Sequence, residues 1–140
     1  MICFLAVISS VLLVSIGVLH FYWAVGGKWA IEKVSPTKGV NEPIKMPGFI
    51  ITFLVGIIVF FVGVMYAVKG NVIQLKITEK LSYYTVLAFA IIFLIRVIGD
   101  FKYVGLFKKI NKTTFAKYDT LIFIPLCLFF SIVGFALVLF

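Results

Sequence analysis

The side chains that could do chemistry in this sequence are few, and they lie inside or beside long apolar runs. They are His20, Arg96, Asp100 and Asp119. Ionisable residues are rare in such runs because they are costly there, and they usually face a bundle interior or a water-filled cavity. An arginine holds an anion through two parallel hydrogen bonds, and a histidine beside a carboxylate can transfer a proton. The four residues therefore indicate an anion-binding pocket or an acid/base pair.

Patterns for metal binding and nucleophilic catalysis are missing from the sequence. The chain has one histidine, and its two cysteines, Cys3 and Cys127, belong to no CxxC pair. It has no GxSxG motif and no glycine-rich phosphate-binding loop. We therefore expect no metal and no cofactor, and an enzyme is the less favoured interpretation. If the protein is an enzyme, His20 and Asp119 are the candidate catalytic acid and base.

A purely structural role also explains the polar residues. Arg96 and Asp100 are separated by one helical turn, a spacing that favours an ion pair on one helix face. Asp119 precedes an apolar run, and its carboxylate is suited to cap the first turn of that helix. This interpretation predicts that Arg96 and Asp100 form one energetic unit, so that removing either residue leaves the charge of the other without a partner.

The elements that must position these residues are membrane-spanning helices. Of 140 residues, 64% are hydrophobic and 13% are charged, whereas soluble domains have about 45–50% apolar and about 25% charged residues. Four apolar runs reach the length of about 20 residues that a spanning helix needs. The sequence predicts an all-α integral membrane bundle of four transmembrane helices. We expect one domain over residues 1–140, with spans at 2–25, 49–68, 82–98 and 120–140.

Small residues indicate how the second span packs. Thr52, Gly56, Gly63 and Ala67 fall on one face at helical spacing. Lipid provides no hydrophobic drive between helices, so close backbone approach at small residues favours helix association. This face should pack against another helix, either within the bundle or in a partner membrane protein.

Residues 100–117 are predicted to form an interfacial segment, because aromatic residues and lysines alternate there. Apolar side chains would enter the acyl boundary while lysines meet anionic headgroups. The expected interfacial anchors of the chain are Trp29, Lys102, Tyr103, Lys108 and Lys109. The net charge of +8 is explained by loop lysines rather than by a nucleic-acid partner, since no separate basic domain exists.

The lysines also predict topology. Nine lysines lie in the first and third loops: Lys28, Lys33, Lys38, Lys45, Lys102, Lys108, Lys109, Lys112 and Lys117. The second loop has only Lys69, Lys76 and Lys80. Cytoplasmic loops carry the excess of positive charge, so both termini are expected to be extracytoplasmic.

This topology brings the polar residues to one leaflet. We predict a pocket at the cytoplasmic interface, lined by His20, Trp23, Arg96, Asp100 and Asp119. Its expected ligand is a polar or anionic small molecule or a lipid headgroup, held by Arg96 and oriented by the carboxylates. Two alternatives are an accessory subunit of a larger membrane complex and a small membrane enzyme that uses His20 as acid or base.

Several segments resemble a known family. They are LHFYWAVGGKW from Leu19, RVIGDFKYVG from Arg96, TFAKYDT from Thr114, and Pro125-Leu126. The chain resembles, over nearly its whole length, an uncharacterised family of short four-helix membrane proteins from bacteria, catalogued as a domain of unknown function. The resemblance implies a four-helix fold and a bacterial plasma membrane, and it implies no activity.

Overall fold

Four long helices make up most of the molecule. The computed structural model describes residues 1–39, 41, 43–45 and 47–140, and this part of the chain contains helices and no strand. The long helices are α1 (Ile2–Ala24), α3 (Phe49–Lys69), α4 (Glu79–Ile98) and a fourth over Thr114–Leu139. The fourth consists of α5 (Thr114–Tyr118), the π-helical turn η1 (Asp119–Phe123) and α6 (Ile124–Leu139). The short helix α2 (Ile31–Val34) follows α1.

The four long helices are long and apolar enough to cross a membrane. Many apolar side chains on their outer faces are exposed, among them Ile50, Leu54, Ile95, Leu121 and Ile132. A helix that is apolar all round belongs in a core or in lipid. The predicted all-α membrane bundle is therefore confirmed, and its outward faces are suited to contact the bilayer.

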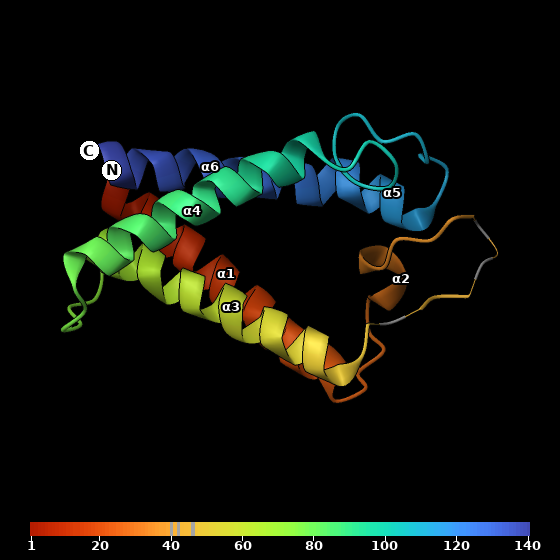
Figure 1. The fold of residues 1–140 in the computed structure, drawn as a ribbon, viewed down its shortest axis with the longest axis horizontal. Coiled ribbons are helices and arrows are strands. Elements are labelled where there is room, and N and C mark those ends of the chain that lie inside the picture. Colours follow the sequence, from red (N-terminus) through yellow and green to blue (C-terminus); the bar gives the residue numbers. More distant parts are fainter. Residues whose placement is uncertain (40, 42, 46) are drawn as a thin grey trace.

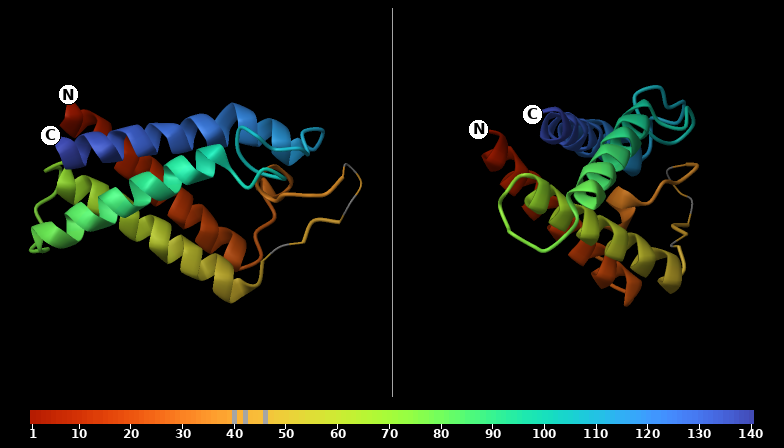
Figure 2. Two further views of the ribbon diagram at one scale, coloured as in Figure 1. Left: turned by 45° about the horizontal axis from the view of Figure 1, so that its top comes forward. Right: turned by 60° about the vertical axis from the view of Figure 1, so that its left-hand side comes forward.

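The helices pack as two antiparallel pairs, α1 with α3 and α4 with α6. The pairs converge at the end that carries both termini and diverge toward the end that carries α2 and α5 (Figure 1). Figure 2 shows the same divergence from two other directions. The loop from α4 to α5 and the segment around α2 therefore share the wide end of the bundle.

Glycines allow α1 and α3 to approach closely. A Cβ atom added at Gly17 would lie 2.9 Å from the backbone nitrogen of Phe60 and 3.0 Å from the carbonyl oxygen of Gly56. A Cβ atom at Gly63 would lie 3.0 Å from the backbone nitrogen of Val14. The predicted packing face of the second span is buried, and its partner is α1.

The hydrophobic core lies where the two pairs converge. Its fully buried members include Leu13, Val62, Met65, Val86 and Phe130. Two polar side chains within it use backbone acceptors on other helices. The Tyr66 hydroxyl donates to the Phe130 carbonyl at 3.0 Å, and the Ser131 hydroxyl donates to the Ala90 carbonyl at 2.9 Å. These bonds satisfy donors that lipid could not.

The fourth helix starts earlier than the sequence indicated. Thr113 is its N-cap, and the Thr113 hydroxyl accepts a hydrogen bond from the Ala116 N–H at 3.1 Å. The prediction that Asp119 caps this helix is therefore wrong. Asp119 lies inside the helix as the first residue of η1, where its side chain is free to serve another purpose.

Candidate functional site

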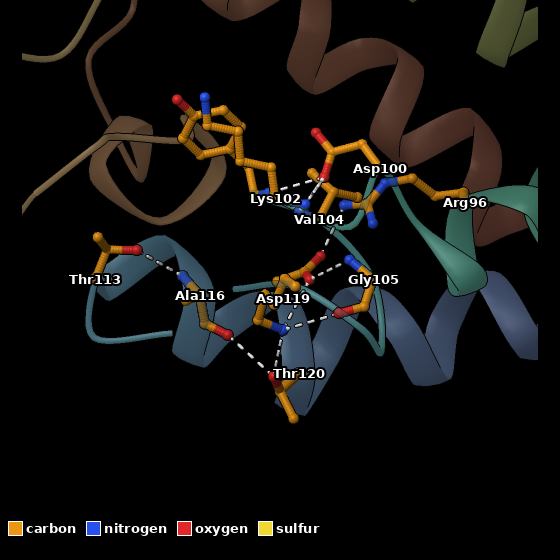
Figure 3. Close-up of polar contacts among 11 residues, drawn as sticks. Arg96, Asp100, Lys102, Val104, Gly105, Thr113, Ala116, Asp119 and Thr120 are labelled. Carbon is orange, nitrogen blue, oxygen red and sulfur yellow. Dashed lines mark hydrogen bonds and ion pairs between the residues drawn. The ribbon is translucent and has the colours of Figure 1, made fainter. Parts of the chain in front are cut away.

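A fully buried carboxylate organises the wide end of the bundle. The Asp119 side chain is 0% exposed and accepts hydrogen bonds at both oxygens. Arg96 Nη2 donates to Oδ1 at 2.7 Å, and the Gly105 N–H donates to Oδ2 at 3.0 Å (Figure 3). Lys108 Nζ also donates to Oδ2, at 3.1 Å. The last turn of α4, the loop that follows it and η1 meet at this one side chain.

Lys108 is part of this cluster and not an interfacial anchor. Its side chain is only 6% exposed. Besides Asp119, its ammonium group donates to the Thr120 hydroxyl at 2.6 Å and to the Gly105 carbonyl at 3.3 Å. The sequence prediction for Lys108 is wrong, because a buried carboxylate attracts the lysine away from the lipid headgroups. Trp29, Lys102 and Lys109 are exposed and Tyr103 is half-buried, so these four stay predicted anchors.

The predicted pairing of Arg96 with Asp100 is also wrong. Helix α4 ends at Ile98, and Gly99 follows with φ +88, so the helical spacing that would bring the two side chains together is lost. Oδ1 of Asp100 accepts hydrogen bonds from the N–H groups of Lys102, Tyr103 and Val104 at 2.8 to 3.0 Å. These bonds lower the pKa of the exposed Asp100 carboxyl. Asp100 therefore shapes the loop, and Arg96 is available to Asp119.

The π-helical turn explains how Asp119 reaches this position. The Ile124 N–H donates to the carbonyl of Asp119, five residues earlier, and Pro125 follows immediately. Proline has no N–H and its ring clashes with the carbonyl four residues before it in a regular helix. A wider turn relieves that clash, and turns of this kind recur at functional sites. Here it directs the Asp119 carboxylate toward α4.

A cleft of about 570 Å³ lies beside this cluster, between α1 on one side and α4, η1 and α6 on the other. Helices α2 and α5 border it at the wide end. Most of its lining is apolar, with Leu13, Ile16, Leu19, Val34, Val59, Phe93, Phe115, Ile122, Phe123, Leu126 and Phe130 among the residues. Its size falls within the roughly 300–1,000 Å³ of small-molecule sites.

The predicted pocket residues divide into two groups. His20, Trp23 and Arg96 line the cleft, whereas Asp100 and Asp119 do not. Sequence reasoning missed Lys33 and Tyr118, which also line it. The only sequence signal for Lys33 was its place in a short helical stretch. For Tyr118 the signal was its position next to Asp119 in the chain.

His20 is held by its own helix and by a tryptophan. Its Nδ1 lies 2.8 Å from the Ile16 carbonyl oxygen, and its ring meets the Trp23 ring edge-on at 5.2 Å between centroids. A carbonyl can only accept, so Nδ1 carries a proton and Nε2 is the acceptor in the neutral ring. Asp119 has its hydrogen-bond donors elsewhere, and no hydrogen bond joins it to His20 within the described residues.

Arg96 has unused hydrogen-bonding capacity at the cleft. Nη2 is bonded to Asp119, but Nη1 is buried and has no partner within the part of the chain that the structure describes. The Arg96 side chain as a whole keeps 30% of its surface exposed. An unsatisfied donor at membrane depth is costly. Arg96 also lines the cleft, so a shift of its side chain would allow Nη1 to reach an acceptor there.

Helix α2 covers the wide end of the cleft. Lys33 Nζ lies 4.9 Å from the centroid of the Tyr118 ring on α5, a cation–π contact. The Trp23 indole N–H donates to the Trp29 carbonyl at 2.8 Å, which ties the end of α1 to the chain just before α2. Two contacts thus fix α2 over the opening between α1 and α5.

The fold and the cluster define a polytopic helical membrane protein with a polar centre at one end of the bundle. The chain belongs to the family described as Protein of unknown function (DUF3995), whose model matches residues 13–134. The resemblance to an uncharacterised family is confirmed, and the matched range includes the cleft and the Asp119 cluster. No curated protein and no solved structure matches the chain.

Proposed function

We propose that this membrane protein binds a polar or anionic small molecule, or a lipid headgroup, in the cleft between α1 and the α4 and α6 pair. The observation that supports this most is the Arg96 guanidinium, which borders the cleft with one buried nitrogen unpartnered among the described residues. With a shift of the guanidinium toward the cleft, an anion would satisfy that donor through a charge-assisted hydrogen bond. His20 also lines the cleft, and its Nε2 would accept a hydrogen bond from a donor group of the ligand.

The Asp119 cluster acts as the support for this site. Binding groups work best when their geometry is fixed before the ligand arrives. One edge of Arg96 is fixed by the 2.7 Å bond to a carboxylate that is fully buried, and that carboxylate is itself held by Lys108 and Gly105. Asp119 is thus a positioning residue, and Arg96 is the residue that would touch the ligand.

Two alternatives have weaker support. The small-residue faces that favoured an accessory subunit are used inside the molecule, because Gly17, Gly56 and Gly63 bring α1 onto α3. The enzyme alternative needed His20 and Asp119 to act together, and both oxygens of Asp119 are occupied by other donors. With the lysine-rich loops inside, the cleft mouth lies at the cytoplasmic interface, and the family resemblance favours a bacterial plasma membrane.

The experiment fills the cleft without replacing any residue of the ion pairs. Cys127→Phe adds a ring to the cleft lining, and Cys3→Phe is the matched control, because Cys3 is exposed and lies outside that lining. Native mass spectrometry of protein purified in mild detergent should show a bound species on the wild type and on Cys3→Phe, and less of it on Cys127→Phe. Equal retention by all three, with unchanged melting temperatures, would contradict the proposal.

A further inference from the structure

The cleft changes in character along its length. Its inner end is formed by Leu13, Val59, Phe93, Leu126 and Phe130, all of which belong to the hydrophobic core or pack against it. Its outer end is formed by Trp23, Trp29, Lys33, Arg96 and Tyr118. On α1 alone the distance from Leu13 to Trp23 is about 15 Å at roughly 1.5 Å per residue. This is about half of the roughly 30 Å hydrocarbon core, the depth of one leaflet.

The outer end has a surplus of positive charge. Arg96 and Lys108 contribute two cations to the cluster and Asp119 contributes one carboxylate, which leaves a net charge of one. Lys33 adds a second positive charge at the mouth. The described lining contains no aspartate or glutamate. The mouth therefore favours a negatively charged group and disfavours a cationic one.

The apolar part of the cleft cannot select a ligand by itself. A hydrocarbon chain gains little by moving from lipid into an apolar groove, because the lipid is as apolar as the groove. Charge at the mouth is the property by which the protein can distinguish one amphiphile from the bulk lipid around it. Selectivity must therefore come from Arg96 and Lys33, while the apolar end sets the shape of the tail.

We infer that the ligand is an anionic amphiphile, with its hydrocarbon tail toward Phe130 and its carboxylate or phosphate beside Arg96 and Lys33. This inference rests on the proposed function and specifies its ligand class. The amphiphile enters between the diverging helix pairs, and the head stops at the wide end under α2. A free single-chain acid and an anionic phospholipid share this chemistry, so both belong in the test.

The molecule carries its own reporter for the measurement. The chain has two tryptophans, Trp23 and Trp29, and both line the outer end of the cleft. Their fluorescence can be followed as protein in a neutral detergent is titrated with five probes of stated chemistry. These are a long-chain fatty acid, the alcohol and the trimethylammonium of the same chain length, acetate, and an anionic phospholipid.

The long-chain acid or the anionic phospholipid should change the fluorescence and bind at least about tenfold more tightly than the alcohol, since a charge-assisted hydrogen bond separates them. Lys33→Gln should reduce that preference, and Lys28→Gln, which alters an exposed lysine outside the lining, should not. Both lysines lie outside the Asp119 cluster, so neither change removes the Arg96 support.

The possible outcomes test the role of the charge, the role of the tail and the source of the ligand. Equal binding of the acid, the alcohol and the trimethylammonium would overturn the inference, because charge would then have no role. Acetate that binds as tightly as the long-chain acid would overturn it too, while leaving the proposed anion site in place. If none of the five probes binds, the inference fails, whereas the proposed function is decided by the mass spectrometry of the bound species. Binding of the phospholipid without the single-chain acid would support the inference and identify a lipid headgroup as the source.

Discussion

Arg96 Nη2 and Asp119 Oδ1 are 2.7 Å apart, and they join the last turn of α4 to the first residue of η1. The two residues are separated by the whole loop between α4 and α5, which packs around them through Gly105 and Lys108. One ion pair therefore determines both where the loop lies and where the arginine faces the cleft.

Removing Asp119 should strongly destabilise the protein. Asp119→Ala leaves Arg96 and Lys108 as uncompensated charges, and the loss of one partner from a buried pair costs about 3–5 kcal/mol. We expect the lower end of that range, because the Arg96 side chain is 30% exposed and partly solvated. The measurement is the free energy of unfolding in detergent.

A matched carboxylate and a double change test the cause of that loss. Glu79→Gln removes an 88% exposed carboxylate that lies 3.8 Å from Lys69, and it should shift stability by less than about 1 kcal/mol. Arg96→Met combined with Asp119→Leu should cost less than the sum of the two single changes. Simple additivity would show that the two residues act independently.

Asp100 should contribute to stability in a pH-dependent way. Three backbone N–H groups lower its pKa in the folded state, so its contribution is fully present above the unfolded value of about 3.9. The contribution is lost as pH falls through the lower folded value. Asp100→Asn should therefore be less stable than wild type at neutral pH, and the difference should shrink under acid. A difference that stays constant from neutral to strongly acidic pH would contradict this assignment.

The contact between α1 and α3 should not tolerate a single methyl group. Gly17→Ala places a Cβ within 3.0 Å of backbone atoms of α3, and overpacking of this kind costs about 1–3 kcal/mol. Gly48→Ala is the control, because beyond its chain neighbours no atom of the described residues lies within 4 Å of its Cβ position, and its φ of −59 suits alanine. Melting temperatures in the same detergent should fall for Gly17→Ala and stay unchanged for Gly48→Ala. The opposite order would mean that the helices separate more easily than this packing implies.

The lysine distribution predicts that both termini are extracytoplasmic. Alkaline phosphatase fused after Phe140 should be active, because it folds only outside the cytoplasm, and a fluorescent reporter at the same site should be dark. The reverse pattern would place the cleft mouth at the outer leaflet.

What the sequence could predict was set by periodicity and composition. The spacing of Gly56 and Gly63 predicted a packing face correctly, because helix geometry alone places them together. The partner of Arg96 was not predictable in this way, because it depends on where α4 ends, and Gly99 at φ +88 ends it before Asp100 is reached. The burial of Lys108 depends on a carboxylate eleven positions away in the chain that only the folded loop brings near. Long-range polar contacts of this kind leave no periodic signal.

The π-helical turn at Asp119–Phe123 changes how the residues before it are rotated about the helix axis relative to the residues after it. After the turn, Ser131 on α6 contacts the Ala90 carbonyl on α4. At the start of the turn, Asp119 contacts Arg96, which also belongs to α4. In a regular helix each residue turns the chain by about 100°. The wide turn takes up one residue more than an α-helical turn, so regular α-helical winding of the same residues would rotate one of the two contacts away from α4 while the other stays. The extra residue therefore works as a phase adjustment, which lets Asp119 and Ser131 face α4 at the same time.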